Sequence, residues 1–227
     1  MNPLALNGKR VLLTQANHFM GPALREVFSE LGAEVIADES ALDHPERPDA
    51  LIKEAGRVDV LLANLGIPAP STPAADVADD EWRSAFAHMV DPLQRLVRAV
   101  IPQMSARGSG KIILIGSASA LRGIRRASTY SAARGAQLAY IQSVGVELAA
   151  KNVQVNAIAQ NYVDNPTYFP AEVQSNPVFQ EKLKREVPLG RLVSAREDAL
   201  FAAYLASSAA DCFVGQVFPV CGGWVPR

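Results

Sequence analysis

Residues 111–134 read KIILIGSASALRGIRRASTYSAAR, and the predicted fold rests on the change from strand to helix within them. The stretch begins with an uninterrupted apolar run, which is typical of a buried strand, and it ends inside an alanine-rich segment of helical character, residues 131–150. Ser117 should therefore lie at the carboxyl end of a strand, with Tyr130 and Arg134 in the first turns of the next helix. Residues four apart share one helix face, so the phenol and the guanidinium can point the same way.

Strands and helices alternate on both sides of this stretch. We predict strands at residues 9–14, 34–38, 58–63, 111–116, 153–158 and 214–220. We predict helices from the loop 15–21 to about residue 31 and at residues 49–55, 79–89, 92–107, 131–150, 172–186 and 195–207. This alternation predicts an α/β protein with one doubly wound parallel sheet and helices on both faces. We expect residues 1–227 to form a single domain, because no linker or internal repeat divides them.

Composition excludes several classes of function. The formal net charge is −1, so the chain lacks the basic excess that nucleic-acid binding requires. No apolar run is long enough to span a bilayer and the N-terminus has no signal-peptide pattern, so we expect a cytoplasmic protein without a membrane partner. The cysteines and histidines lack metal-ligand spacing, which predicts free thiols and no metal site. These residues are Cys212, Cys221, His18, His44 and His88.

Further motifs resemble the short-chain dehydrogenase/reductase superfamily over nearly the whole chain. They are Ser117 with Tyr130, the run Asn64-Leu-Gly66 after a strand, Asn156 in the next strand, and the closing pair Gly222-Gly223. The resemblance implies a Rossmann-like fold with the active site at the carboxyl edge of the sheet.

The first loop departs from that family. Its usual pattern, T-G-x-x-x-G-x-G, begins here at Thr14, but Gln15 and Phe19 replace the first two glycines and only Gly21 remains. Glycines in this loop let the backbone approach a pyrophosphate, whereas Gln15 and Phe19 add bulk there. Arg134 occupies the position of the family's lysine, which holds the nicotinamide ribose. Arginine has a different shape, so this replacement is not conservative. We therefore expect no dinucleotide and no other cofactor.

The pattern that remains resembles the halohydrin dehalogenases. It comprises Ser, Tyr thirteen residues on and Arg four further, together with Thr14-x-x-x-x-Phe19-x-Gly21. The segments 161–170 and 187–191 also resemble that family. The resemblance implies a carbon–halide lyase that closes vicinal haloalcohols to epoxides, and opens epoxides with azide, cyanide or nitrite. It also implies a homotetramer, with a haloalcohol or epoxide and a halide ion as small-molecule partners.

The resemblance also implies roles for individual residues. Tyr130 would be the general base, Arg134 would favour its phenolate by Coulomb attraction, and Ser117 would hold the substrate oxygen. The leaving halide needs backbone N–H donors and positive aromatic edges. The candidates for this anion site are Phe19, Gln160, Asn161, Tyr162, Val163 and Phe169.

Two alternatives stay open. Asp38 follows the second strand, where a dinucleotide enzyme would hold the ribose hydroxyls, so an NAD(P)-dependent alcohol dehydrogenase with an unusual arginine is one alternative. The other is a non-catalytic module that binds a small molecule on the same fold. Dinucleotide binding would favour the first, and turnover of a haloalcohol would exclude the second.

Overall fold

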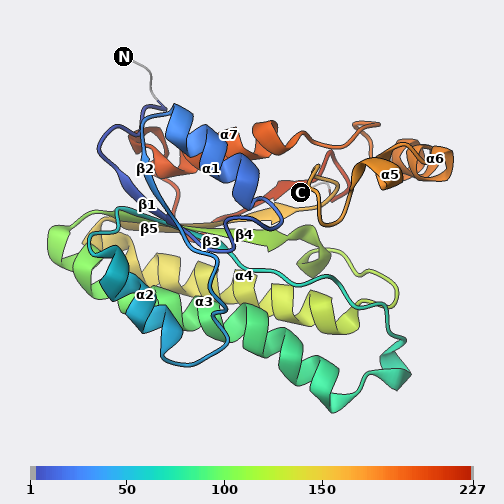
Figure 1. Ribbon diagram of the computed structural model, residues 1–227, viewed down its shortest axis with the longest axis horizontal. Helices are drawn as coiled ribbons and strands as arrows, with labels where there is room; N and C mark the ends of the chain where they lie inside the picture. The colour runs from blue at the N-terminus through green and yellow to red at the C-terminus, as the bar shows by residue number, and fades with distance from the viewer. Residues whose placement is uncertain (1–3, 226–227) are drawn as a thin grey trace.

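Six parallel strands form one sheet through the middle of the molecule, in the order β2-β1-β3-β4-β5-β6 (Figure 1). The computed structural model describes residues 4–225. The strands are β1 (Arg10–Leu13), β2 (Glu34–Ala37), β3 (Val60–Asn64), β4 (Gly110–Ser117), β5 (Val153–Gln160) and β6 (Val217–Val220). The predicted doubly wound α/β fold is confirmed, because the order reverses direction between β1 and β3.

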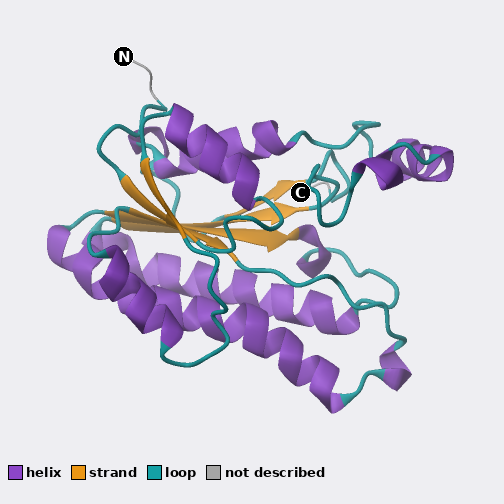
Figure 2. Ribbon diagram, viewed as in Figure 1, coloured by secondary structure: helices purple, strands orange, loops and turns teal. Residues whose placement is uncertain are grey.

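Helices cover both faces of the sheet (Figure 2). On one face lie α1 (Gly21–Glu30) and α7 (Ala195–Ala206), and on the other lie α2 (Arg47–Ala55), α3 (Asp79–Arg107) and α4 (Ser128–Leu148). Two short helices, α5 (Ala171–Gln174) and α6 (Pro177–Glu186), extend beyond the edge of the sheet. Every residue of β3 and β4 is buried, which explains the uninterrupted apolar runs.

Two helix predictions were wrong. The predicted helices at residues 79–89 and 92–107 are one helix, α3, which continues through Pro92 and Pro102. Packing against α4 holds α3 together beside the first proline, where Gln137 Nε2 donates to the Met89 carbonyl at 2.7 Å. Conversely, the predicted helix 172–186 is broken into α5 and α6, since Asn176 caps α6 and the proline at position 177 disfavours a helical residue before it.

Helix α4 begins at Ser128, three residues before the predicted start, so Tyr130 lies in its first turn. Strands β3 and β6 begin later than predicted, at Val60 and Val217. In β6 the reason is Gly215, whose φ of +64° forms a turn rather than extended backbone.

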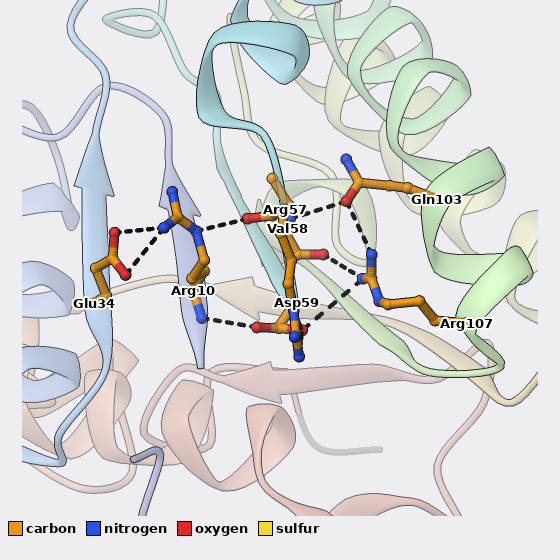
Figure 3. A network of polar contacts seen from close by, with 7 residues as sticks. All are labelled: Arg10, Glu34, Arg57, Val58, Asp59, Gln103 and Arg107. Atoms are coloured by element: carbon orange, nitrogen blue, oxygen red, sulfur yellow. Dashed lines mark hydrogen bonds and ion pairs between the residues drawn. The ribbon is translucent and has the colours of Figure 1, made fainter. Parts of the chain in front are cut away.

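A polar network joins the amino ends of β1, β2 and β3, opposite the edge where the strands end (Figure 3). The Arg10 guanidinium bonds Glu34 of β2, and the Arg10 N–H donates to the Asp59 carboxylate at 3.0 Å. Burial would raise the pKa of Asp59, but the Arg10 N–H and the Arg57 guanidinium hold it below its usual range. This network therefore ties the amino ends of the three strands together.

No helix within residues 4–225 is long and apolar enough to cross a membrane. The same residues contain no group of three His, Cys, Asp or Glu side chains that could hold a metal ion. Cys212 is exposed and Cys221 is buried, and both are free thiols as predicted.

Candidate active site

A cavity of about 210 Å³ lies at the carboxyl ends of β4 and β5. All nine candidate catalytic and anion-site residues line it, although they lie as far apart in the chain as residues 19 and 169. These are Ser117, Tyr130, Arg134, Phe19, Gln160, Asn161, Tyr162, Val163 and Phe169. The parallel topology explains this grouping, because the loops after successive strands meet at one edge of the sheet.

Tyr130 and Arg134 form a buried pair on the first turns of α4. The guanidinium Nε donates to the phenol oxygen at 3.0 Å, and the Arg134 side chain is only 5% exposed. Its Nη1 donates to the carbonyls of Leu65 and Ile115 at 2.9 and 3.2 Å and to the Gln137 amide oxygen at 3.0 Å. The planar Arg134 guanidinium thus holds its positive charge beside the phenol oxygen. The same group donates hydrogen bonds to carbonyls at the ends of two strands.

Ser117 is the last residue of β4, which places its hydroxyl on the cavity wall. Its Oγ accepts the Ser119 N–H at 3.2 Å and shares a hydrogen bond of 2.9 Å with the Ser119 hydroxyl. These bonds orient the Ser117 hydroxyl while a cavity face stays available to a ligand oxygen.

The first loop is closed by its own side chains. Gln15 and Phe19 have φ values of 46° and 52°, the left-handed conformation in which glycine is usual. The Gln15 amide donates to the Gly66 carbonyl at 3.0 Å and accepts the Gly66 N–H at 2.9 Å. The Phe19 ring packs so closely on Gly66 that an added Cβ there would lie 3.3 Å from it. These side chains compensate for the backbone strain and fill the space above the loop.

The loop 161–170 forms the opposite wall of the cavity. Tyr162 has a φ of 51°, and the next N–H, that of Val163, has no acceptor among residues 4–225. The Tyr162 ring stacks on Phe169 with centroids 6.0 Å apart, and its hydroxyl donates to Glu186 at 2.9 Å. Burial, aided by Glu186, raises the pKa of Tyr162 to about 12, so this phenol keeps its proton. An unpaired N–H beside aromatic edges suits a small anion.

Tyr168 has no role of its own in the sequence pattern, yet its hydroxyl lies 3.2 Å from that of Tyr130. Asn165 positions it, because the Asn165 side chain accepts the Tyr168 N–H at 2.9 Å. An asparagine three residues before a tyrosine is an ordinary turn signal, so the sequence offered no distinct indication of this contact. The loop is also joined to the first loop, where the Phe19 N–H donates to the Thr167 hydroxyl.

Comparisons with known proteins decide the family. A family model described as enoyl-(acyl carrier protein) reductase matches residues 2–225. This chain belongs to the short-chain dehydrogenase/reductase superfamily. It is 33% identical to cis-4-hydroxycyclohexanecarboxylate dehydrogenase of Sinomonas cyclohexanicum over 78% of this chain and 69% of that protein. It is 28% identical to the 3-oxoacyl-[acyl-carrier-protein] reductase FabG of Vibrio cholerae, covering 96% of this chain and 98% of the relative.

Solved structures of this superfamily include similar proteins with a different chemistry. A structure named as a dehalogenation enzyme superposes with a TM-score of 0.90 at 30% identity, covering 97% of this chain and 99% of the other. A halohydrin dehalogenase bound to ethyl (2S)-oxiran-2-ylacetate superposes with a TM-score of 0.87 at 29% identity, covering 96% and 99%. The superfamily therefore spans reductases and dehalogenases, and the site must distinguish them.

Most dehydrogenases and reductases of this superfamily bind a nicotinamide dinucleotide, and the residues here do not fit one. Gln15 and Phe19 fill the space in which a pyrophosphate would approach the loop backbone. Asp38 would be the ribose ligand, but its Oδ1 is bonded by Ser40 at 2.8 Å and Arg47 at 3.3 Å. The other carboxylate oxygen, Oδ2, is buried and has no partner within the described part of the chain. An ion pair with Arg47 thus holds the Asp38 carboxylate in a buried position.

Asp198 is a buried acid behind the cavity wall. It lies on α7, where its Oδ2 accepts a hydrogen bond from the side-chain amide of Gln160, a cavity residue. Its Oδ1 has no partner among the residues described. Burial raises the pKa of Asp198 to about 7, although the Gln160 bond opposes the shift.

Stability is therefore expected to depend on pH through Asp198. Folded Asp198 keeps its proton up to about pH 7, whereas an unfolded aspartate releases it near pH 3.9. Between these values the folded state binds more protons, so the free energy of unfolding falls as pH rises, by up to about 4 kcal/mol. Urea unfolding at a series of pH values measures this slope. Asp198→Asn should flatten it while the exposed control Asp76→Asn should not, and an unchanged slope in Asp198→Asn would contradict the assignment.

Proposed function

We propose that the cavity is the active site of a halohydrin dehalogenase, a carbon–halide lyase that needs no cofactor. The observation that supports this best is the combination of two features at one site. A buried Tyr130–Arg134 pair faces the cavity, and Gln15 and Phe19 fill the space that a dinucleotide would need. The first feature suits proton transfer, and the second removes the usual hydride carrier.

The forward reaction is a ring closure without redox change. The substrate hydroxyl binds Ser117 and Tyr130, and Tyr130 takes its proton as general base. The alkoxide oxygen then forms a bond to the neighbouring carbon while the carbon–halogen bond breaks, and the halide leaves with its electron pair. The products are an epoxide, a halide ion and one proton. Arg134 stabilises negative charge on the phenol oxygen through its Nε–H at 3.0 Å.

The halide would occupy the opposite wall of the cavity. The Val163 N–H, which has no acceptor within residues 4–225, and the edges of Phe19, Tyr162 and Phe169 would provide partial positive charge without a full cation. In the reverse direction an anion such as azide, cyanide or nitrite would attack the epoxide carbon from this place, and Tyr130 would return the proton. The epoxide ester bound to the similar dehalogenase supports an epoxide as the ligand class.

An NAD(P)-dependent reductase is the second candidate. The names of the sequence relatives favour it, as does Asp38, whose Oδ2 lacks a partner among the described residues. This candidate requires the side chains of Gln15 and Phe19 to move away from the backbone of the first loop. That movement would break both hydrogen bonds from the Gln15 amide to Gly66. The homotetramer and the cytoplasmic location expected from the sequence stay predictions.

Halide release tests the proposal. Purified protein is incubated with 1,3-dichloro-2-propanol without any added nucleotide, and chloride, protons and epoxide are measured together. The proposal predicts equal amounts of the three products and no effect of added NADH or NADPH. Oxidation or reduction that depends on a nicotinamide, in the absence of chloride release, would establish the reductase instead.

A further inference from the structure

A second phenol contacts the proposed base. The Tyr168 hydroxyl lies 3.2 Å from the Tyr130 hydroxyl and 2.6 Å from the carbonyl oxygen of Ile67. Both tyrosines line the cavity, and Arg134 Nε reaches the Tyr130 oxygen from another direction at 3.0 Å. The Tyr130 oxygen therefore has two protein partners, one charged and one neutral.

The hydroxyl of Tyr168 has one proton and two acceptors within reach. A phenol donates one hydrogen bond and accepts others, so the proton points either to the Ile67 carbonyl or to Tyr130. When Tyr130 carries a proton, Tyr168 can donate to Ile67 and accept from Tyr130. When Tyr130 is a phenolate, a charge-assisted bond from Tyr168 is the stronger of the two choices. Rotation of one hydroxyl suffices for this exchange.

We propose that Tyr168 supports the base by turning its phenolic proton to the Tyr130 oxygen when that oxygen becomes negative. This inference rests on the proposed function, in which Tyr130 removes the substrate proton. It assigns Tyr168 a supporting role that acts through Tyr130, without contact to the carbon centre that reacts.

Burial keeps Tyr168 a donor throughout the working range of pH. Burial, with the neighbouring Tyr130 as a further cause, raises the pKa of Tyr168 well above its usual value, so this phenol keeps its proton. Its ring is fixed independently of the hydroxyl, because it packs 5.5 Å from the Phe19 ring and 6.5 Å from the Phe169 ring. Removal of the hydroxyl alone should therefore leave the cavity wall in place.

Few charged groups surround Tyr130 and Tyr168. Within residues 4–225, Arg134 is the charged side chain in contact with Tyr130, and it also interacts with Tyr168. Helix α3 packs on Tyr130 through Ala85, Met89 and Phe86, which are not ionisable. His18 of the first loop is exposed, and the nearest acid of the 161–170 loop along the chain, Asp164, bonds Gln174. A change in pH behaviour on altering Tyr168 can thus be assigned to the Tyr168–Tyr130 contact.

Tyr168→Phe tests the proposal kinetically. It is expected to lower kcat/KM for a haloalcohol about tenfold at neutral pH, and to move the acid limb of the pH profile up by about one unit. Activity should recover towards the wild-type value at higher pH, while KM stays close to wild type. The control is Tyr204→Phe, which removes a phenol remote from the cavity and should change neither quantity. An unchanged profile, or a loss equal at every pH, would overturn the proposal.

A spectroscopic titration separates this inference from the proposed function. The near-ultraviolet absorbance of phenolate is followed with pH in wild type, Tyr130→Phe and Tyr168→Phe, without substrate. The signal that disappears in Tyr130→Phe belongs to Tyr130, and Tyr168→Phe should move it to higher pH by about one unit. A shift in a protein that releases no halide would leave the supporting contact standing and refute the dehalogenase. Halide release with an unshifted phenolate signal would support the dehalogenase and refute the supporting contact of Tyr168.

Discussion

Replacing Tyr130 with phenylalanine is expected to lower halide release from a haloalcohol about a thousandfold, within the range that general-base catalysis contributes. The ring stays, so its packing against Ala85, Met89 and Ala133 is preserved. What is lost is the oxygen that Arg134 Nε contacts at 3.0 Å and that would accept the substrate proton. Initial rates of halide release at saturating substrate, together with a thermal unfolding scan, measure the effect.

The control for this variant is Tyr140→Phe. Tyr140 lies on the same helix and is half-buried, but it does not line the cavity. It should keep wild-type activity, whereas Tyr130→Phe should lose activity without a large change in Tm. A Tyr130→Phe variant that retains a tenth or more of the wild-type rate would show that another group removes the proton.

Arg134→Lys is expected to impair both catalysis and stability. An ammonium group cannot donate to the phenol, two strand-end carbonyls and the Gln137 amide in one geometry, as the guanidinium does. Loss of the Nη1 bonds to the buried carbonyls of Leu65, which keeps only a 3.4 Å bond from Gln137, and of Ile115 should lower the free energy of unfolding by about 3 kcal/mol. Loss of the fixed donor on Tyr130 should lower kcat/KM by about a hundredfold.

Urea unfolding and steady-state kinetics on the same preparation measure these two effects. Arg125→Lys provides the matched control, since Arg125 is exposed on the loop before α4. Arg134→Lys with wild-type stability would show that the strand-end carbonyls find other donors. Wild-type kcat/KM in a stable Arg134→Lys variant would show that the shape of the guanidinium has no part in catalysis.

Much of the fold follows directly from sequence patterns. Apolar runs such as residues 111–116 predict strands that are buried on both faces, and their alternation with helices admits few topologies. Helix continuity was harder to predict, because Pro92 normally ends a helix and only tertiary contacts along α4 reveal that α3 continues. The break before Pro177 follows from the local rule that proline disfavours a helical conformation in the residue before it. The prediction of one helix over residues 172–186 did not take this rule into account.

The site was predictable where topology alone brings residues together. Ser117 and Gln160 are the last residues of the adjacent strands β4 and β5, and residues 161–163 follow β5, so their meeting at one cavity needed no side-chain detail. Contacts that depend on side-chain direction were not predictable. The Gln15 amide closing on Gly66, the Asp198 acid behind Gln160, and the Tyr168 phenol on Tyr130 are of this kind. Each joins segments far apart in the chain, and no spacing rule connects them.

Crystals grown with both NADPH and sodium bromide show whether a small anion replaces the dinucleotide in this protein. We expect an anomalous bromide peak between Phe19 and Tyr162 within reach of the Val163 N–H, and no nucleotide density over residues 15–21. NADPH lying over that loop with its nicotinamide beside Tyr130, and no bromide in the cavity, would contradict this expectation.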